Sequence, residues 1–470
     1  MTRFALRGSP ADYDEWAGLG CAGWGFTDVL PYFRRLEADA DFGDQPWHGD
    51  GGPMPVTRYL NLQLTAIGAA GLQALEAAGF PMVDDRNRPG AVGAARIPMS
   101  SRAGIRVTTA DAYLPAGGTP ENLTIRPGAQ VADVVFDGTH AAGVRLLDGH
   151  VIEAGWVVLC AGTYGSPPIL MRSGVGPAAH LRSHGIAVRL DLPGVGANLA
   201  DHAGVDIDCG YRGPARTAPI FHLLATFRSS ATPSDQAPDL MLWLFDPRGD
   251  PPVFEIDVGL LRPRSRGAVR LRSPHPAEPP RIDLPGKRDP FDVGRLAEAY
   301  RRGLEVASRP EIRRLCAEPP APRPLSTSEL PDLIRAKGYS LPHVAGTCAM
   351  GPHPDDGAVV ETSERVYGTG RLSVIDASVI PNGPSAFTHI PTRDARRAPL
   401  RTARLGNLTS GPGLPGSALR AGFIGNWRPS ERRSRYQAHG SRRRHPPPAR
   451  NWPTPPRCQP APCGAGTVRP

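Results

Sequence analysis

Two histidines stand in segments that could carry proton transfer. His343 follows a proline and precedes the glycine-rich run Gly346–Gly351, and His389 lies shortly after the segment 376–381. An imidazole with an ordinary pKa near ~6.5 can take the proton of a hydroxyl group at neutral pH. The alkoxide formed in this way is a better hydride donor, and a second imidazole can hold its oxygen by a hydrogen bond. The alternative for each residue is a loop or core histidine that has no catalytic role.

A glycine-rich stretch in the middle of the chain is the second chemical feature. It runs from Gly162 to Pro177 and is followed by the segment 192–202, which ends in Asp201-His202. An ordinary turn between a strand and a helix could have the same composition. We interpret His202 as a hydrogen-bonded structural residue. Asp376, at the end of a predicted buried strand, can accept hydrogen bonds from a cofactor or from backbone groups, and a plain strand-end cap is its alternative role.

Taken together, these stretches resemble the glucose–methanol–choline (GMC) oxidoreductase family. The residues from Gly162 to Pro177 fit the second signature of that family, and their spacing to the segments around His343 and His389 also fits. The resemblance covers the chain from about residue 3 to residue 392. It includes Arg7–Trp16, Trp47–Pro53, Asn122–Ile125 and Ser265–Val269.

The resemblance implies an α/β (α+β) fold class, with a three-layer FAD-binding domain and an inserted antiparallel-sheet substrate domain. It implies oxidation of a small-molecule alcohol with FAD as cofactor, His343 as the general base and His389 at the second catalytic position. The positions that match flavin-lining residues are Val131, Ala161, Gly162, Asp376, Ala377 and Ile390. The electron acceptor stays open between oxygen, a quinone and another carrier. Some family members are lyases, which the motifs alone do not exclude, and no metal site is predicted.

Four regions are predicted along the chain. Residues 1–210 form the FAD-binding domain, 211–340 the substrate domain, and 341–392 a return to the FAD domain with the catalytic segment. Residues 393–470 lack apolar periodicity and are predicted to be a disordered Arg/Pro-rich tail. Helices are predicted at 27–36, 65–78, 167–173, 293–307 and from about 326 to 338, and strands at 123–147 (paired), 151–160, 240–245, 253–261, 268–271 and 372–380.

Composition narrows the classes of function. The net charge of +9 comes from the tail, since residues from Arg393 onward contain 16 Arg and two acidic residues, and the preceding residues are mildly acidic. Nucleic-acid binding is therefore not expected, although the Arg-rich tail leaves an RNA contact as a weak alternative. No apolar run is long enough to span a membrane. Seven scattered cysteines without a CxxC pair suggest reduced thiols and a cytoplasmic protein.

The letters of Gly18–Gly23 match a dinucleotide-binding loop, but their context does not. Such a loop connects a buried strand to a helix that faces a pyrophosphate, whereas polar and aromatic residues 11–16 precede this one. We interpret it as a glycine-rich turn. We therefore expect that the N-terminal βαβ unit of the family is missing before Met1, and that a frameshift produced the tail. The alternative function is a catalytically inactive fragment that cannot retain FAD.

Overall fold

The computed structural model describes residues 4–59, 64–114, 120–215, 221–285, 289–317 and 329–395. These residues all lie in one compact unit, Met1–Trp427. The predicted tail 393–470 falls almost entirely outside the described residues, so the prediction of disorder is not addressed there. Among the described residues no helix is both long and apolar enough to cross a membrane.

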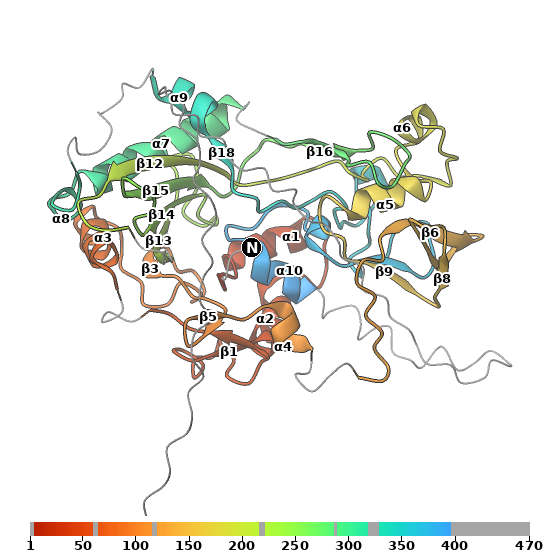
Figure 1. Cartoon of the computed structure of the whole chain (residues 1–470), viewed down its shortest axis with the longest axis horizontal. Coiled ribbons are helices and arrows are strands. Elements are labelled where there is room, and N and C mark those ends of the chain that lie inside the picture. The colour runs from red at the N-terminus through yellow and green to blue at the C-terminus, as the bar shows by residue number, and fades with distance from the viewer. Residues whose placement is uncertain are drawn as a thin grey trace, which may run out of the picture. The chain divides into compact units, whose positions relative to one another are not determined.

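A six-stranded antiparallel sheet is the largest element (Figure 1). Its strand order is β18 (Tyr339–Ser340), β12 (Ala203–Gly210), β15 (Val253–Leu260), β14 (Leu240–Phe245), β13 (Phe221–Phe227) and β3 (Gly93–Arg96). The alternating runs at 240–245 and 253–261 predicted β14 and β15. The sheet also takes β3 and β12 from the part of the chain before residue 211. The division at residue 211 thus does not follow the edge of the sheet, and it stays a prediction.

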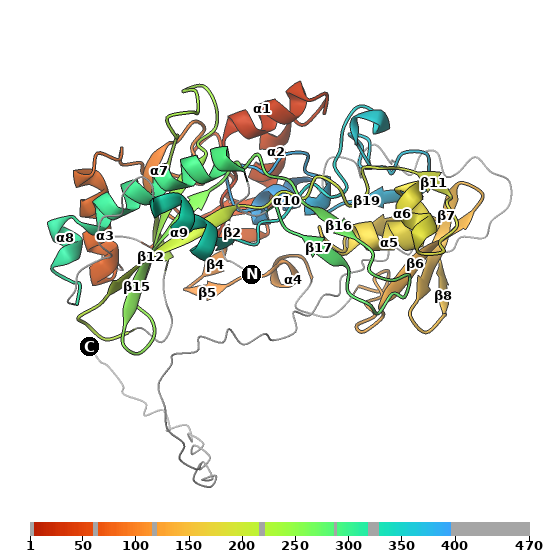
Figure 2. The same cartoon turned by 90° about the horizontal axis from the view of Figure 1, so that it is seen from above.

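The two faces of this sheet have different neighbours. On one face, α7 (Pro290–Ala307) lies along the strands together with α3 (Ala66–Ala77) and α9 (Glu329–Lys337), and apolar side chains fill the space between (Figure 2). The opposite face carries Trp243 and Met241, which pack against Phe4 and Phe387. Successive side chains of a strand point to opposite faces. The same strand therefore contributes side chains to the core under the helices and to the aromatic cluster on the other face.

The second part of the fold contains the predicted cofactor-binding elements. Strands β6 (Val131–Asp137), β7 (His140–Leu146) and β8 (Val151–Glu153) form a three-stranded antiparallel sheet, while β9 (Val157–Leu159) pairs in parallel with β19 (Leu372–Val374). Two strand predictions are wrong in detail. The stretch 151–160 contains two strands of different sheets, and the stretch 372–380 leaves the strand at Val374 and enters the 3-10 helix η3 (Ala377–Val379).

Helix α1 (Pro10–Gly18) was missed in the sequence. Ser9 and Asp12 form a capping box at its N-terminus, Pro10 is its first residue, and Tyr13 and Trp16 are buried. The glycines of Gly18–Gly23 follow this helix and no strand precedes them, so their interpretation as a turn agrees with the structure.

Smaller elements complete the described chain. They are α2 (Phe26–Leu36), β1 (Glu37–Asp39), β2 (Met54–Val56), β4 (Ser101–Arg102), β5 (Ile105–Arg106), α4 (Thr109–Tyr113), α5 (Ser166–Arg172), β10 (Val175–Gly176), α6 (Ala178–Ser183), β11 (Leu190–Asp191), β16 (Ala268–Arg270), β17 (Arg281–Asp283), α8 (Pro310–Arg313), η2 (Pro354–Asp356) and α10 (His389–Ala395). Helix α10 packs on α2 and starts at one of the two predicted catalytic histidines.

Candidate active site

His343 is held in a buried position by the segment that precedes β12. Its backbone N–H donates to Asp201 Oδ1 at 2.8 Å, and the hydroxyl of Ser340 donates to the other oxygen of the same carboxylate. The backbone N–H of Leu341 donates to the carbonyl of His202 at 3.0 Å. The Asp201-His202 pair therefore fixes the path of the chain on both sides of Pro342. The His343 side chain is 8% exposed.

The two predicted catalytic histidines lie near each other, on either side of Phe387 in the contacts and sequence that join them. The His343 ring stacks on Phe387, with centroids 4.1 Å apart and planes at 18°. His389 lies two residues after Phe387, at the first position of α10. Its Nδ1 lies 3.0 Å from the carbonyl oxygen of Phe4, which can only accept, so Nδ1 carries the proton. His343 and His389 interact electrostatically, and their catalytic roles stay predictions.

The surroundings of His343 keep its imidazole neutral. Burial lowers the pKa of His343 well below its ordinary value, and the nearby imidazoles of His202 and His389 lower this pKa further. At neutral pH the ring therefore has one nitrogen with a lone pair, which is the form required of a base.

His202 is also buried and neutral, and it lies beside His343. The two ring centroids are 5.4 Å apart with planes at 59°. Its Nε2 donates to the carbonyl of Pro384 at 3.1 Å, in line with the structural role predicted for it. Burial lowers the pKa of His202 to about 4, an effect that the Pro384 hydrogen bond only partly offsets. His202 also lines a cavity of about 180 Å³ together with His343.

Asp376 ties together the ends of the two parallel strands. Its carboxylate accepts hydrogen bonds from Gly162 N at 2.9 Å, Ser166 Oγ at 2.5 Å and Ser378 N at 2.8 Å. Two of these donors are backbone N–H groups, one of the kinds of partner expected from the sequence, and the third is a serine hydroxyl. The carboxylate orders the loops that leave the carboxyl ends of β9 and β19, the edge at which parallel α/β sheets bind ligands.

The other predicted flavin-lining residues fit a cofactor site to different degrees. Ala161, Gly162 and Ala377 are half-buried at this strand edge, and Gly162 has a φ of +80° with open space where a side chain would point. A planar group can approach the backbone closely there. Val131 and Ile390 are buried in the adjoining core. The residues present at the strand edge therefore suit a bound cofactor.

Sequence reasoning did not find the aromatic side chains around the imidazoles. The rings of Phe4, Trp243 and Phe387 lie 4.9 to 5.4 Å apart in each pairing. They come from the first described residue, from β14 and from the segment before α10, so no local pattern joins them.

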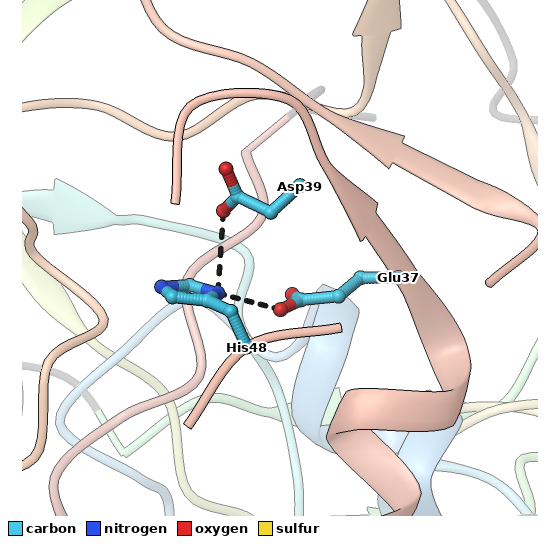
Figure 3. Close-up of side chains that lie close together, drawn as sticks. All are labelled: Glu37, Asp39 and His48. Atoms are coloured by element: carbon cyan, nitrogen blue, oxygen red, sulfur yellow. Dashed lines mark hydrogen bonds and ion pairs between the residues drawn. The ribbon is translucent and has the colours of Figure 1, made fainter. Parts of the chain in front are cut away.

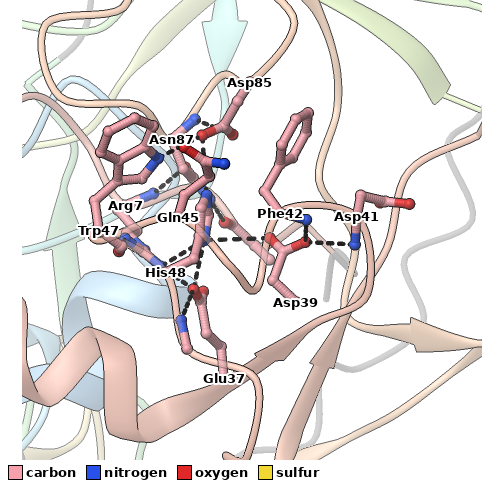
Figure 4. Close-up of polar contacts among 12 residues, drawn as sticks. Arg7, Glu37, Asp39, Asp41, Phe42, Gln45, Trp47, His48, Asp85 and Asn87 are labelled. Atoms are coloured by element: carbon pink, nitrogen blue, oxygen red, sulfur yellow. Dashed lines mark hydrogen bonds and ion pairs between the residues drawn. The ribbon is translucent and has the colours of Figure 1, made fainter.

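A second buried polar cluster lies near β1, away from the imidazoles, and we call it the His48 network. His48 Nδ1 lies 2.6 Å from Glu37 and 3.3 Å from Asp39, and its Nε2 lies 2.9 Å from Asp85 (Figures 3 and 4). Arg7 pairs with Glu37, and Arg58 pairs with Asp39 at 2.8 Å and Asp85 at 3.0 Å. Three cationic side chains thus face three carboxylates.

The geometry of Glu37, Asp39 and His48 could also suit a metal ion, since their ligand atoms lie within 4.8 Å of one another. The two guanidinium groups already supply the positive charge that the carboxylates need. Burial by itself lowers the pKa of His48, but the hydrogen bonds to Asp85 and Glu37 outweigh it and raise this pKa. The rise in pKa favours the protonated ring, which does not bind a metal, so the cluster is better described as an ion-pair network.

Comparison with known proteins shows what the chain as a whole is similar to. The GMC oxidoreductase family model matches residues 2–204 with its N-terminal part and 263–393 with its C-terminal part. The chain is 34% identical over 417 residues to 5-(hydroxymethyl)furfural oxidase of Methylovorus sp., covering 82% of this chain and 77% of that protein. It is 33% identical to an oxygen-dependent choline dehydrogenase of Paraburkholderia phymatum over 82% of this chain and 74% of that protein.

A solved structure extends the comparison to the fold. Pyridoxine 4-oxidase from Mesorbium loti superposes with a TM-score of 0.78 at 27% identity, over 85% of this chain and 82% of that one. The predicted α/β fold class and the FAD cofactor are confirmed by these matches. The chain belongs to the GMC oxidoreductase family of FAD-dependent alcohol dehydrogenases and oxidases.

Proposed function

We propose that this chain oxidises a small-molecule alcohol to a carbonyl compound, with His343 as the base that removes the hydroxyl proton. The observation that carries this proposal is that the buried His343, whose ring stacks on Phe387, lies close enough to the partly buried His389 for that imidazole to affect its pKa. FAD, when bound, supplies the hydride acceptor. Gly162 and Ala377, with Asp376 ordering their loops, are the residues expected to hold it.

Two features suit His343 to its role. Its low pKa keeps the ring unprotonated at neutral pH, and general-base catalysis of this kind contributes roughly 10²–10⁴-fold to a rate. Its burial also removes water from the reacting hydroxyl, which strengthens every hydrogen bond made in the transition state.

His389 would hold the oxygen of the substrate. Because its Nδ1 already donates to Phe4, it can donate from Nε2 only as the imidazolium. A positive charge at this point stabilises the alkoxide that forms as the proton leaves. The first imidazole thus acts as a neutral acceptor and the second as a charged donor.

The aromatic side chains suggest the substrate class. Phe4, Trp243 and Phe387 form a buried aromatic cluster that contacts His343 through Phe387, and a substrate site bounded by this cluster would suit a primary alcohol attached to an aromatic ring. The relatives named for hydroxymethylfurfural and pyridoxine are consistent with such a substrate. Aromatic faces also attract quaternary ammonium groups, so choline is the second class to be tested.

The experiment is a flavin assay followed by a substrate panel. The purified full chain is expected to carry one flavin and to oxidise furfuryl or benzyl alcohol faster than choline, with either oxygen or a quinone as acceptor. A flavin-bound chain that oxidises no alcohol of the panel would contradict the proposal. A colourless chain that takes up no added FAD would favour the inactive-fragment alternative.

A further inference from the structure

His202, which lines the cavity beside His343, has a buried acceptor atom without a partner among the described residues. The cavity of about 180 Å³ is lined by His202 and His343, by Asp201 and Asn382, and by Glu15 and Arg262 among others. His202 is 2% exposed, and its Nδ1 has no hydrogen-bond partner among the described residues. A buried polar atom in this condition costs about 1–3 kcal/mol unless a partner is supplied.

The tautomer of His202 is fixed by its other nitrogen. Nε2 faces the carbonyl of Pro384, an oxygen that can only accept, so Nε2 carries the ring proton. The low pKa of His202 means that Nδ1 is unprotonated at neutral pH. The Nδ1 of His202 therefore has a lone pair without a partner, in a ring that lies beside His343.

His343 requires an acceptor of this kind. A neutral imidazole that takes a proton on one nitrogen carries a hydrogen on the other, and the partner of that N–H decides which nitrogen is the base. Among the described residues the His343 ring makes no hydrogen bond, and Phe387 covers one of its faces.

The other acceptors near His343 are already engaged. Both oxygens of Asp201 accept from the 340–343 segment, and Glu15 binds Arg262 and Asn382. The His389 ring donates to Phe4. His202, whose ring centre is 5.4 Å from that of His343, is distinguished from these acceptors because its Nδ1 has no partner at all among the described residues. If the rings turned so that this nitrogen faced a nitrogen of His343, the two atoms would lie about 3 Å apart, which is the distance of a direct hydrogen bond.

We propose that His202 is a positioning residue for His343: its Nδ1 accepts the hydrogen bond of the His343 ring N–H, and so sets the His343 nitrogen that takes the hydroxyl proton. This inference rests on the proposed function of His343 as base. An uncharged acceptor has a clear consequence here, because it orients the ring without the negative charge that would raise the pKa of His343.

Two isosteric substitutions test the proposal. In His202→Asn the amide oxygen replaces the Nδ1 acceptor, whereas in His202→Gln the amide nitrogen replaces Nε2 and no acceptor remains at Nδ1. With ¹⁵N-labelled histidine, His343 is expected to show one neutral tautomer in the full-length protein and in His202→Asn, and a mixture in His202→Gln. The kcat for alcohol oxidation is expected to fall about tenfold in His202→Gln with little change in KM, and to recover largely in His202→Asn.

His180→Gln is the matched control. His180 is partly buried and accepts from the backbone N–H of Leu271, outside the cavity, so neither the His343 tautomer nor kcat is expected to change. An unchanged His343 tautomer in His202→Gln, or equal losses in the Asn and Gln variants, would overturn the inference. If the protein oxidises no alcohol, the proposed function fails, while the nitrogen spectra still decide whether His202 orients His343.

Discussion

The His48 network and the imidazole site around His343 are both buried, but their polar groups are satisfied in opposite ways. In the network, His48 contacts carboxylates through both ring nitrogens, and two arginines complete the charge balance. In the imidazole site the rings lie among aromatic side chains and one another, with no carboxylate bound to a ring of His202 or His343 among the described residues. Burial lowers the pKa of both site histidines, whereas carboxylates raise that of His48.

This difference separates two uses of the same side chain. A histidine whose nitrogens are both engaged contributes stability, and its proton is not available for chemistry. A histidine kept neutral and incompletely hydrogen-bonded costs stability, and this cost is characteristic of residues retained for function. Four measurements test this difference between the His48 network and the imidazole site.

The largest effect is expected from His343→Asn. Loss of the base should reduce kcat/KM by about 10²–10⁴-fold, with a smaller loss of thermal stability than in His48→Asn, because the His343 ring takes part in no ion pair among the described residues. The measurement is steady-state alcohol oxidation by protein of known flavin content. His48→Asn is the matched comparison and should show the reverse, a lower melting temperature with the remaining folded protein active. A reduction in kcat/KM of less than tenfold in His343→Asn would place the base elsewhere.

The next effect is on stability, in Arg58→Met. Removing this guanidinium leaves His48 as the remaining basic partner of the buried carboxylates of Asp39 and Asp85, and breaking a buried pair in this way costs about 3–5 kcal/mol. Urea unfolding followed by circular dichroism measures the change. Asp332→Asn breaks an exposed pair with Arg335 and should change the free energy of unfolding by less than ~1 kcal/mol. Equal effects of the two substitutions would show that the His48 network does not stabilise the fold.

Some parts of the fold and of the imidazole site could be predicted from the sequence, and others could not. His343 and His389 stand in motifs that local residue types make visible, and β14 and β15 could be predicted from their apolar runs. The contact of Phe4 with Trp243 and Phe387 could not, because it depends on how three distant segments pack. Strand β3 was missed since Gly93-Ala94-Ala95-Arg96 lacks alternation and pairs with β13 far along the chain. Helix α1 could have been found from Ser9, Pro10 and Asp12.

The two kinds of histidine should also differ in their pH dependence. The raised pKa of His48 means that its stabilisation is fully present below the unfolded value of ~6.5 and is lost as the pH rises through the folded value. The pKa of Asp85 is lowered, because the hydrogen bond of His48 and the charge of Arg58 outweigh burial, so its contribution is lost only in strong acid.

Melting temperatures measured across pH test this expectation. Stability of the native sequence should decline above neutrality, and His48→Gln should remove most of that decline. In contrast, kcat/KM should have its acid limb below pH ~6.5, because the pKa of His343 is lowered. An acid limb well above pH ~6.5 would mean that the pKa of the base is raised, as it is for His48, and not lowered.

The smallest effect is expected from metal removal. Carboxylate oxygens that could bind an ion in the cluster of Glu37, Asp39 and His48 already accept from Arg7 and Arg58, and the raised pKa of His48 favours its protonated form. Dialysis against EDTA should therefore leave the melting temperature unchanged, and added Zn²⁺ should not raise it. If elemental analysis finds one tightly bound metal per chain, and this metal is lost in Asp39→Asn, the His48 network is a metal centre and not an ion-pair network. A bound metal would require His48 to be neutral, so the decline in stability above neutrality would also have to disappear.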